Sequence, residues 1–207
     1  RRQRQMCIRD SECSTAEEVL DKLRAGLHIY VREGSGAKNL ETLIKTMLDA
    51  GVCLDRCAFC TDDKHVEEIR KEGHISTCIR KAIALGVPVA KAYKMGSYQA
   101  AEFYGLKNYG AIGAGYRADI VFLDDLEQVR PLDVMKDGRI LTEEDYAKDY
   151  SVPVPDELLH TVHVGEVTKD KIKLSCSGKT DVIQMNPHQI VTTHLIEEVP
   201  AENGYFK

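Results

Sequence analysis

The chain has 207 residues, which is enough to bury the core of one large domain or of two small ones. Its 33 acidic residues outnumber its 28 basic residues, and the resulting net charge of -5 disfavours a surface that binds nucleic-acid phosphates. It contains no apolar stretch near the roughly 20 residues that cross a bilayer, and its seven cysteines are an odd number, so we expect a cytoplasmic protein with reduced thiols and no membrane contact.

The first eleven residues differ in character from the sequence that follows them. The string RRQRQMCIRDS shows no helical or strand periodicity and no capping signal. It resembles a translated sequencing-adapter read, and such segments are excluded when a fold is inferred. We therefore expect residues 1–11 to be an artefact that lies outside the fold.

A helix and a strand are the first predicted elements. Two overlapping capping boxes, at Ser14 and Thr15, predict a helix of about three turns that ends at Gly26. Residues 28–31 are β-branched and aromatic, which predicts a short strand. The polar, glycine-containing segment 32–36 predicts a loop directly after this strand.

A second helix and a second strand follow the loop. Asn39 is expected to cap the helix, which carries its apolar residues on one face and ends at Gly51. Residues 57–61 form the second predicted strand, and Asp62 and Asp63 lie at its C-terminal end. The order of strand, loop, helix and strand is typical of a βαβ unit in a parallel sheet.

The rest of the chain changes from helical to mainly β. Residues 65–104 are predicted to be helical, with breaks at Gly73 and Pro88. Residues 110–140 are turn-rich, and the acidic, proline-containing stretch 142–157 predicts a linker. Strand-like apolar runs are found at residues 120–123, 162–167, 172–174, 182–185 and 190–195.

Polar residues follow both predicted strands at their C-terminal ends. Arg32 and Glu33 follow the first strand, and Asp62 and Asp63 follow the second. In (β/α)₈ barrels the catalytic groups lie at this end of the strands. Acidic residues after strands are also common as helix caps and solvated turn residues, so position alone does not decide their role.

Four segments of the chain carry distinctive motifs: REGSGAKNL (32–40), CTDDKH (60–65), KEGHI (71–75) and YGLKNYGAIGAGYRADIVFLDDLE (104–127). In this order they resemble the motifs of the bacterial adenine deaminase family, which belongs to the amidohydrolases. The REGS and TDD-x-H strings are the specific ones, because GAIGAGYRADIVFLD is similar to many amidohydrolases. The resemblance runs from about Glu12 to the end of the chain, and the tail 189–199 is similar to the start of that family's C-terminal domain.

This resemblance implies an α/β fold that contains part of a (β/α)₈ amidohydrolase barrel. Residues 12–104 would supply the last strands and helices of the barrel, and residues 105–160 a small β domain and linker. Residues 161–207 would be the truncated start of the C-terminal domain. A homo-oligomer is expected for the full-length protein.

The resemblance also implies the hydrolysis of adenine to hypoxanthine and ammonia, for purine salvage, at a binuclear Mn²⁺ or Fe²⁺ centre. Asp62 matches the aspartate that binds metal and carries the proton, with Asp63 as the second choice. Arg32, Glu33 and Ser35 would lie beside the substrate adenine or order the loop. Weaker candidate site residues, matched to the motifs alone, are Glu12, His65 and His74.

The sequence departs from the family pattern upstream of these motifs. The His-x-His pair and the middle-strand ligands of the family would precede residue 12. The motif Asp-His-Glu-Cys appears here as Asp10-Ser11-Glu12-Cys13, without its histidine. We therefore expect a truncated chain that cannot assemble the binuclear site and is inactive by itself.

Three further functions stay open. Cys53, Cys57 and Cys60 fit the cysteine pattern of radical S-adenosylmethionine enzymes, which hold an iron-sulfur cluster. Against this, strand alternation places Cys57 and Phe59 on one face and Ala58 and Cys60 on the other. The second function is that of an amidohydrolase acting on cytosine or another cyclic amide, and the third is that of a non-catalytic β-rich binding module.

Overall fold

The computed structural model describes residues 9–10, 12–148, 151–176, 178–187 and 191–207. It divides into two compact units. Of the described residues, unit 1 contains 9–10, 12–142 and 187, and unit 2 contains 143–148, 151–176, 178–186 and 191–207. All site residues predicted from the sequence lie in unit 1.

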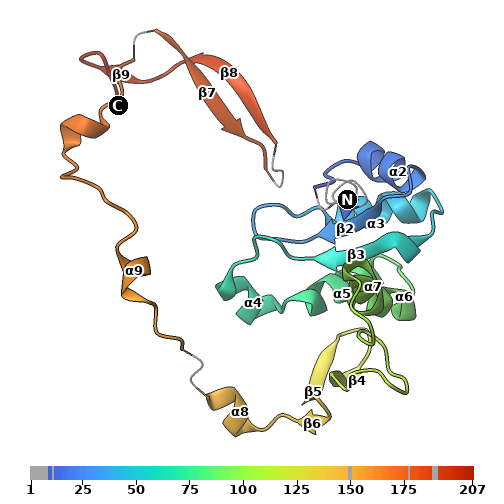
Figure 1. The fold of residues 1–207 in the computed structure, drawn as a ribbon. Helices are drawn as coiled ribbons and strands as arrows, with labels where there is room; N and C mark the ends of the chain where they lie inside the picture. The colour runs from blue at the N-terminus through green and yellow to red at the C-terminus, as the bar shows by residue number, and fades with distance from the viewer. Residues whose placement is uncertain (1–8, 11, 149–150, 177, 188–190) are drawn as a thin grey trace. The chain divides into compact units, whose positions relative to one another are not determined.

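A parallel three-stranded sheet lies at the centre of unit 1 (Figure 1). Strand β2 (His28–Arg32) lies between β1 (Arg9–Asp10) and β3 (Cys57–Cys60). Strands β2 and β3 pair in parallel, and the helix α3 (Leu40–Asp49) and a 3₁₀ turn (Leu54–Arg56) connect them, which confirms the predicted βαβ unit. Among the described residues this sheet has three strands and does not close into a barrel.

Strand β1 corrects, for Arg9 and Asp10, the expectation that residues 1–11 lie outside the fold, while residues 1–8 and 11 are outside the described part of the chain. Arg9 and Asp10 pair in parallel with the first two residues of β2. The Asp10 carboxylate accepts a hydrogen bond from the Glu12 N–H at 2.8 Å and forms an ion pair with Lys22 of α2 (Ala16–Arg24). Pairing with a buried neighbouring strand gives these residues an extended structure that their own sequence does not predict.

The two helices beside the sheet begin after the predicted residues, but for different reasons. Helix α2 follows Thr15, whose hydroxyl accepts a bond from the Glu18 N–H while the Glu18 carboxylate accepts one from the Thr15 N–H. This is a complete capping box. Helix α3 follows Asn39, but the Asn39 side chain makes no capping bond and binds Arg32 instead. The predicted cap is therefore wrong for this side chain.

Four helices follow β3 in the described part of unit 1. Gly73 separates the first two and Pro88 precedes the third, as predicted. The last ends at Gly105, whose φ of 69° is left-handed and suits glycine. In the part of the chain that the structure describes, every helix is too short or too polar to cross a membrane. The helices are α4 (Val66–Glu72), α5 (Ile75–Ala84), α6 (Val89–Gly96) and α7 (Tyr98–Tyr104).

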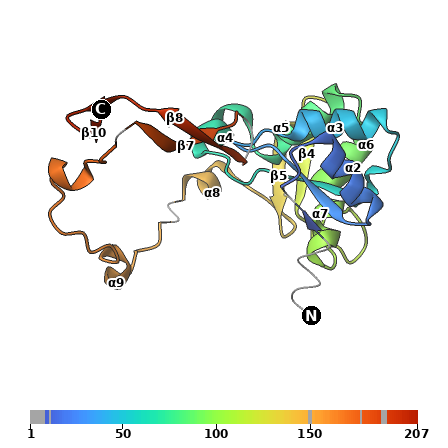
Figure 2. The ribbon, with the colours of Figure 1, turned by 90° about the horizontal axis from the view of Figure 1, so that it is seen from above.

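Hydrophobic clusters cover both faces of the sheet. The larger contains Cys57 and Phe59 together with apolar residues of α2, α3, α5 and α6. The smaller contains Ala58 and Phe103 of α7, and Cys60 packs against it. Figure 2 shows α3 and α7 on opposite sides of the strands. The predicted alternation of the two cysteines between the faces is confirmed.

A small antiparallel sheet completes unit 1. It consists of β4 (Ile120–Asp125), β5 (Arg130–Lys136) and β6 (Arg139–Ile140), which confirms the strand predicted at 120–123. The Tyr93 hydroxyl of α6 donates to the Leu126 carbonyl oxygen at 2.8 Å. This bond ties the β4–β5 loop to the helices that cover the parallel sheet.

Unit 2 contains short elements and one longer hairpin. The strand predicted at 182–185 is confirmed as part of β7. Of the strand predicted at 190–195, residues 192–195 belong to β8, Val191 precedes it, and Ile190 lies outside the described residues. Residues 162–167 are irregular and Ile172 ends a 3₁₀ turn, so the strand predictions at 162–167 and 172–174 are wrong. The elements are α8 (Glu143–Ala147), α9 (Asp156–Leu159), a 3₁₀ turn (Lys169–Ile172), β7 (Lys179–Met185), β8 (Thr192–Glu198), β9 (Ala201–Glu202) and β10 (Tyr205–Phe206).

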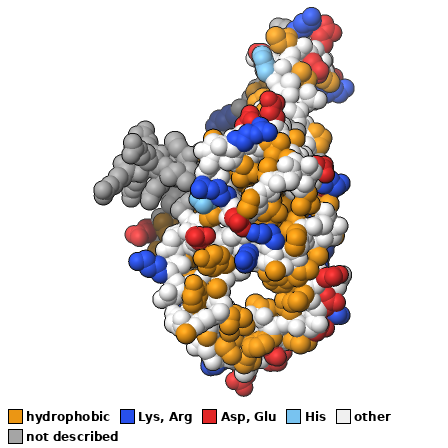
Figure 3. All heavy atoms as spheres, turned by 90° about the vertical axis from the view of Figure 1, so that its right-hand side faces the viewer, with side chains coloured by type: hydrophobic (Ala, Val, Ile, Leu, Met, Phe, Trp, Pro, Cys, Tyr) orange, Lys and Arg blue, Asp and Glu red, His pale blue; other side chains and the backbone are white. Residues whose placement is uncertain are grey.

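Many apolar side chains of the molecule are exposed. In unit 2, Val162, Val164, Ile183 and Met185 are all exposed. A two-stranded hairpin has little apolar surface to bury and is marginally stable by itself. Figure 3 shows hydrophobic side chains, in orange, over much of one face of the molecule.

Candidate functional site

The C-terminal ends of β2 and β3 meet at one edge of the sheet. Arg32 pairs with Cys60, and the Glu33 N–H donates to the Cys60 carbonyl oxygen at 3.0 Å. Asp62 follows Cys60 by two residues, so it lies at the same edge as Glu33. The two acidic residues thus share the C-terminal edge of the parallel sheet, but their carboxylates have different partners, Lys81 for Glu33 and Arg32 for Asp62.

The Asp62 carboxylate is accessible from a pocket at this edge. The pocket has a volume of about 420 Å³, and the Asp62 side chain is 55% exposed. The backbone φ of Asp62 is 47°, a left-handed value that residues other than glycine rarely adopt. Residues held in such conformations cluster at functional sites. The pocket is lined by Tyr30, Cys60, Thr61, Asp62, His74, Ile75 and Tyr104.

Arg32 holds the Asp62 carboxylate from the neighbouring strand. Its side chain is only 2% exposed, and its Nε and Nη2 donate to Asn39 Oδ1 at 3.3 and 3.0 Å. Its Nη1 lies 3.5 Å from Asp62 Oδ2. A buried guanidinium requires a nearby anion, and Asp62 supplies one. Arg32 is therefore connected to the pocket through Asp62 and does not line it.

Glu33 points away from the pocket and toward α5. Its buried carboxylate forms an ion pair of 2.5 Å with Lys81 Nζ. Burial works against the charge of Lys81, but the hydrogen bond and the charge of Glu33 outweigh it and raise the pKa of Lys81. Glu33 therefore fixes the end of β2 to α5, on the opposite side of the strand from Asp62.

Ser35 and Asp63 connect the two loops that follow the strands. The Ser35 hydroxyl donates to Glu68 Oε2 at 2.7 Å and accepts a bond from the His65 N–H at 2.9 Å. The Asp63 carboxylate accepts a bond from the Gly36 N–H at 2.7 Å. Both side chains thus form hydrogen bonds between the two loops, and neither lines the Asp62 pocket.

The three weaker candidates lie in different surroundings. His74 lines the pocket, and its Nε2 lies 2.7 Å from the Thr61 hydroxyl. His65 is exposed and contributes its backbone N–H to the Ser35 contact. Glu12 is exposed beside Asp10 and is not part of the pocket lining. Of the three, only His74 lines the same pocket as Asp62.

Sequence reasoning missed Asn39, Tyr30 and Tyr104. Tyr30 could have been found, because strand alternation puts it on the same face as Arg32. The capping signal of Asn39 gives no indication of its bonds to Arg32. Tyr104 comes from the last turn of α7, and no sequence signal relates that helix to the ends of the strands.

The described residues do not form a metal site by themselves. They contain no group of three or more His, Cys, Asp or Glu side chains that could hold a metal ion. Asp62 has the oxygen chemistry that Mn and Fe accept, but its observed partner is Arg32. The described residues therefore bring too few donors together to hold a metal ion by themselves.

The three cysteines of the radical-enzyme pattern are held apart by the fold. Cys53 is exposed and donates to Asp55 Oδ2 at 3.0 Å. Cys57 is buried against Met47, and Cys60 packs on the other face of the sheet. Burial raises the pKa of Cys57 and of Cys60 to about 12, which keeps both thiols protonated near neutral pH.

We expect these thiols to bind no iron-sulfur cluster and to react very unequally. At pH 8 a thiol reagent should label Cys53 rapidly, whereas Cys57 and Cys60 should stay unlabelled until the chain unfolds, because a thiol with a pKa of about 12 forms little thiolate below pH 10. Mass spectrometry of digested protein measures the labelling, and Cys53→Ala is the control. Stoichiometric iron and sulfide after anaerobic reconstitution, lost in Cys53→Ala, would contradict this expectation.

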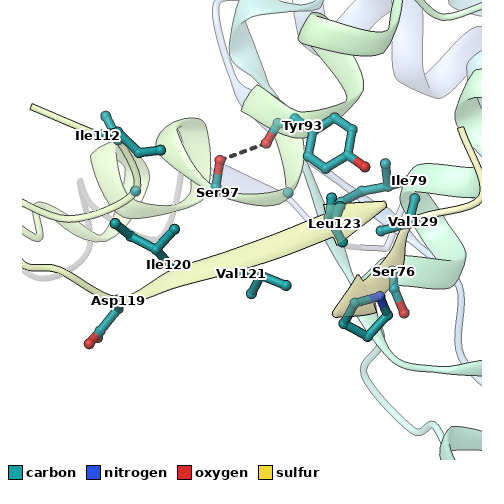
Figure 4. A pocket seen from close by; sticks show the side chains of 14 residues that line it. Ser76, Ile79, Tyr93, Ser97, Ile112, Asp119, Ile120, Val121, Leu123 and Val129 are labelled. Carbon is teal, nitrogen blue, oxygen red and sulfur yellow. Dashed lines mark hydrogen bonds between the residues drawn. The ribbon is translucent and has the colours of Figure 1, made fainter. Parts of the chain in front are cut away.

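A second pocket of about 410 Å³ lies between α5, α6 and the small sheet (Figure 4). Ile79, Ile120, Val121 and Leu123 give it a largely apolar lining. Three of its polar side chains have partners within the protein, because the Ser97 hydroxyl donates to the Tyr93 carbonyl oxygen, the Tyr93 hydroxyl donates to the Leu126 carbonyl oxygen, and Asp119 pairs with Lys136. This pocket therefore lacks the converging polar groups of a catalytic site.

Comparison with known proteins relates the chain to a family of hydrolases. The model of the amidohydrolase family matches residues 3–141. Adenine deaminase of Desulfitobacterium hafniense is 38% identical over 95% of this chain and 34% of its own length, and that of Lysinibacillus sphaericus is 37% identical over 95% and 34%. The chain thus spans about a third of the curated relatives it matches. A β-aspartyl dipeptidase structure from Fervidobacterium islandicum aligns with a TM-score of 0.49 at 19% identity, covering 67% of this chain and 39% of that one.

Proposed function

The chain belongs to the amidohydrolase family, and from this we propose that it carries part of the active site of an enzyme that hydrolyses adenine to hypoxanthine and ammonia. The adenine deaminases of two bacteria match 95% of the chain, which supports this choice of substrate within the family. Since the chain spans about a third of those proteins, the activity is proposed for the whole-length enzyme.

The position of Asp62 is the observation that carries this proposal. Its carboxylate lies at the C-terminal edge of two parallel strands, faces a pocket and is held by Arg32. Tyr30 and Tyr104 line the same pocket with ring centroids 5.8 Å apart, and aromatic surfaces of this kind suit a flat purine ring. The pocket thus combines a carboxylate base with apolar walls.

We assign the proton transfer of the reaction to Asp62. During deamination the oxygen of water bonds to the ring carbon that carries the amino group, and the bond from that carbon to the amino nitrogen breaks. The Asp62 carboxylate can accept a proton from the attacking water and return it to the departing nitrogen, which leaves as ammonia. Arg32 would keep the carboxylate oriented during both transfers, and Ser35 and Glu33 would hold the loops around it.

A metal centre of Mn²⁺ or Fe²⁺ is part of this proposal for the whole-length enzyme. When bound, such a metal supplies a water that loses its proton near neutral pH. The described residues do not hold a metal by themselves, so Asp62 is proposed as one ligand among others from outside the described part. Arg32, Glu33 and Ser35 have partners of their own within the chain, namely Asp62, Lys81 and Glu68.

The test is a whole-length enzyme built by placing residues 12–207 in the frame of the Desulfitobacterium hafniense relative, with an Asp-His pair before Glu12. After addition of Mn²⁺ or Fe²⁺ we expect ammonia release from adenine. A folded, metal-loaded protein that is inert on adenine but acts on cytosine or another cyclic amide would support the family assignment and contradict the choice of adenine as substrate.

A further inference from the structure

Asp62 has a left-handed backbone, a conformation that residues other than glycine adopt uncommonly, although aspartate and asparagine adopt it more often than most. Its φ of 47° lies in the left-handed region, where a side chain crowds the backbone. The Lys64 N–H donates to the Thr61 carbonyl oxygen at 3.1 Å, so Asp62 and Asp63 form the middle of a tight turn after β3. Something outside the turn must hold it, because a strained residue persists only where its surroundings fix it.

The carboxylate of Asp63 is bound in a cradle made by two glycines of the loop after β2. Its Oδ2 accepts the Gly36 N–H at 2.7 Å. A Cβ atom at Gly34 would lie 1.7 Å from Asp63 Oδ1, and a Cβ atom at Gly36 would lie 2.8 Å from Oδ2. Only glycine at both positions lets the carboxylate approach this closely.

The cradle is itself fixed by contacts on both of its sides. The Gly34 N–H donates to the Ala37 carbonyl oxygen at 3.0 Å, and Glu33 pairs with Lys38 across the loop. Ser35, between the two glycines, binds Glu68 and the His65 N–H. These contacts fix the loop, and the loop in turn fixes the position of the Asp63 carboxylate.

We propose that Asp63 is a positioning residue for Asp62. The Asp63 carboxylate, bound between Gly34 and Gly36, holds Asp62 in the left-handed turn. Successive side chains of the turn point in different directions, with Asp62 in the pocket lining and Asp63 in the cradle. Asp63 acts through Asp62 and does not contact the substrate, which removes it as a second choice for the proton carrier. The inference rests on the proposed role of Asp62.

The decisive measurement is the backbone geometry of Asp62 by NMR in the 207-residue chain. The one-bond Cα–Hα coupling and the three-bond coupling between the amide and α protons together separate positive from negative φ. Asp63→Ala removes the carboxylate, and Gly34→Ala displaces it without changing its charge. Both variants should move Asp62 to a negative φ. Asp63→Asn, whose side-chain oxygen can still accept the Gly36 N–H, should keep the positive φ.

Matched controls exclude a general effect of substitution. Asp21→Ala removes an exposed carboxylate paired with Arg24, and Gly165→Ala adds a methyl group in open space. Both should leave the Asp62 couplings unchanged. If Asp63→Ala does not fold, Gly34→Ala with intact Asp63 decides the question. A positive φ of Asp62 in Asp63→Ala and Gly34→Ala, or its loss in the Asp21→Ala control, would overturn the proposal.

Activity gives an independent readout in the whole-length enzyme. Asp63→Ala should lower kcat for adenine by on the order of 100-fold, the effect of misplacing a reacting group by about 1 Å, while KM changes little. Asp63→Asn should restore most of kcat. If the whole-length enzyme does not deaminate adenine at all, the proposed function fails, and the couplings of Asp62 still decide the role of Asp63.

Discussion

Replacing Asp62 by asparagine in the whole-length enzyme should lower the rate of adenine deamination by on the order of 1000-fold. The amide has nearly the shape of the carboxylate, but it cannot accept and return a proton. Asparagine also tolerates a left-handed backbone, so the turn with φ of 47° should persist. Steady-state ammonia release measures the rate, and circular dichroism with thermal unfolding verifies the fold.

Asp21→Asn is the matched control for this experiment. Asp21 is exposed on α2 and pairs with Arg24 at 2.9 Å, away from the ends of the strands. Its replacement should leave kcat unchanged within a factor of about two, as expected for a surface charge. If Asp62→Asn were folded and retained most of the activity, Asp62 could not be the proton carrier.

The 207-residue chain alone should release no detectable ammonia from adenine, with or without Mn²⁺ or Fe²⁺. Its described residues bring no three metal-binding side chains together, and Asp62 is the only residue of the pocket lining with a carboxylate. A single carboxylate binds these ions too weakly to retain them. Ammonia assays test the expected lack of activity, and metal analysis after gel filtration tests the expected lack of bound metal.

The whole-length enzyme described above is the positive control for this experiment. Residues 12–207 should support ammonia release from adenine when they are part of that enzyme. Deamination by the 207-residue chain that is abolished neither by chelation nor by Asp62→Asn would place the site elsewhere in the molecule.

The sequence predicts the elements around the site well because local patterns determine them. The capping box at Thr15 and the apolar periodicity of residues 40–48 are local, and they predict α2 and α3. Strand alternation predicts the separation of Cys57 from Cys60, since each face of a buried strand contacts a different layer. The shared edge of Glu33 and Asp62 follows from the parallel arrangement alone.

The partners of the site residues could not be predicted, because they come from distant parts of the chain. Glu33 binds Lys81, 48 residues away, and Ser35 binds Glu68, 33 residues away. Asn39 has a good local signal for capping, yet its bonds to Arg32 replace that role. The strand predictions at 162–167 failed for the related reason that an apolar run becomes a strand only when a partner strand is available.

The exposed apolar surface of the hairpin β7–β8 affects how the protein can be prepared. Ile183, Met185 and Ile196 are all exposed on its two strands. Exposed apolar patches of this kind favour aggregation during overexpression. Slow expression at low temperature, a solubilising fusion partner and dilute purification are therefore the conditions that match this structure.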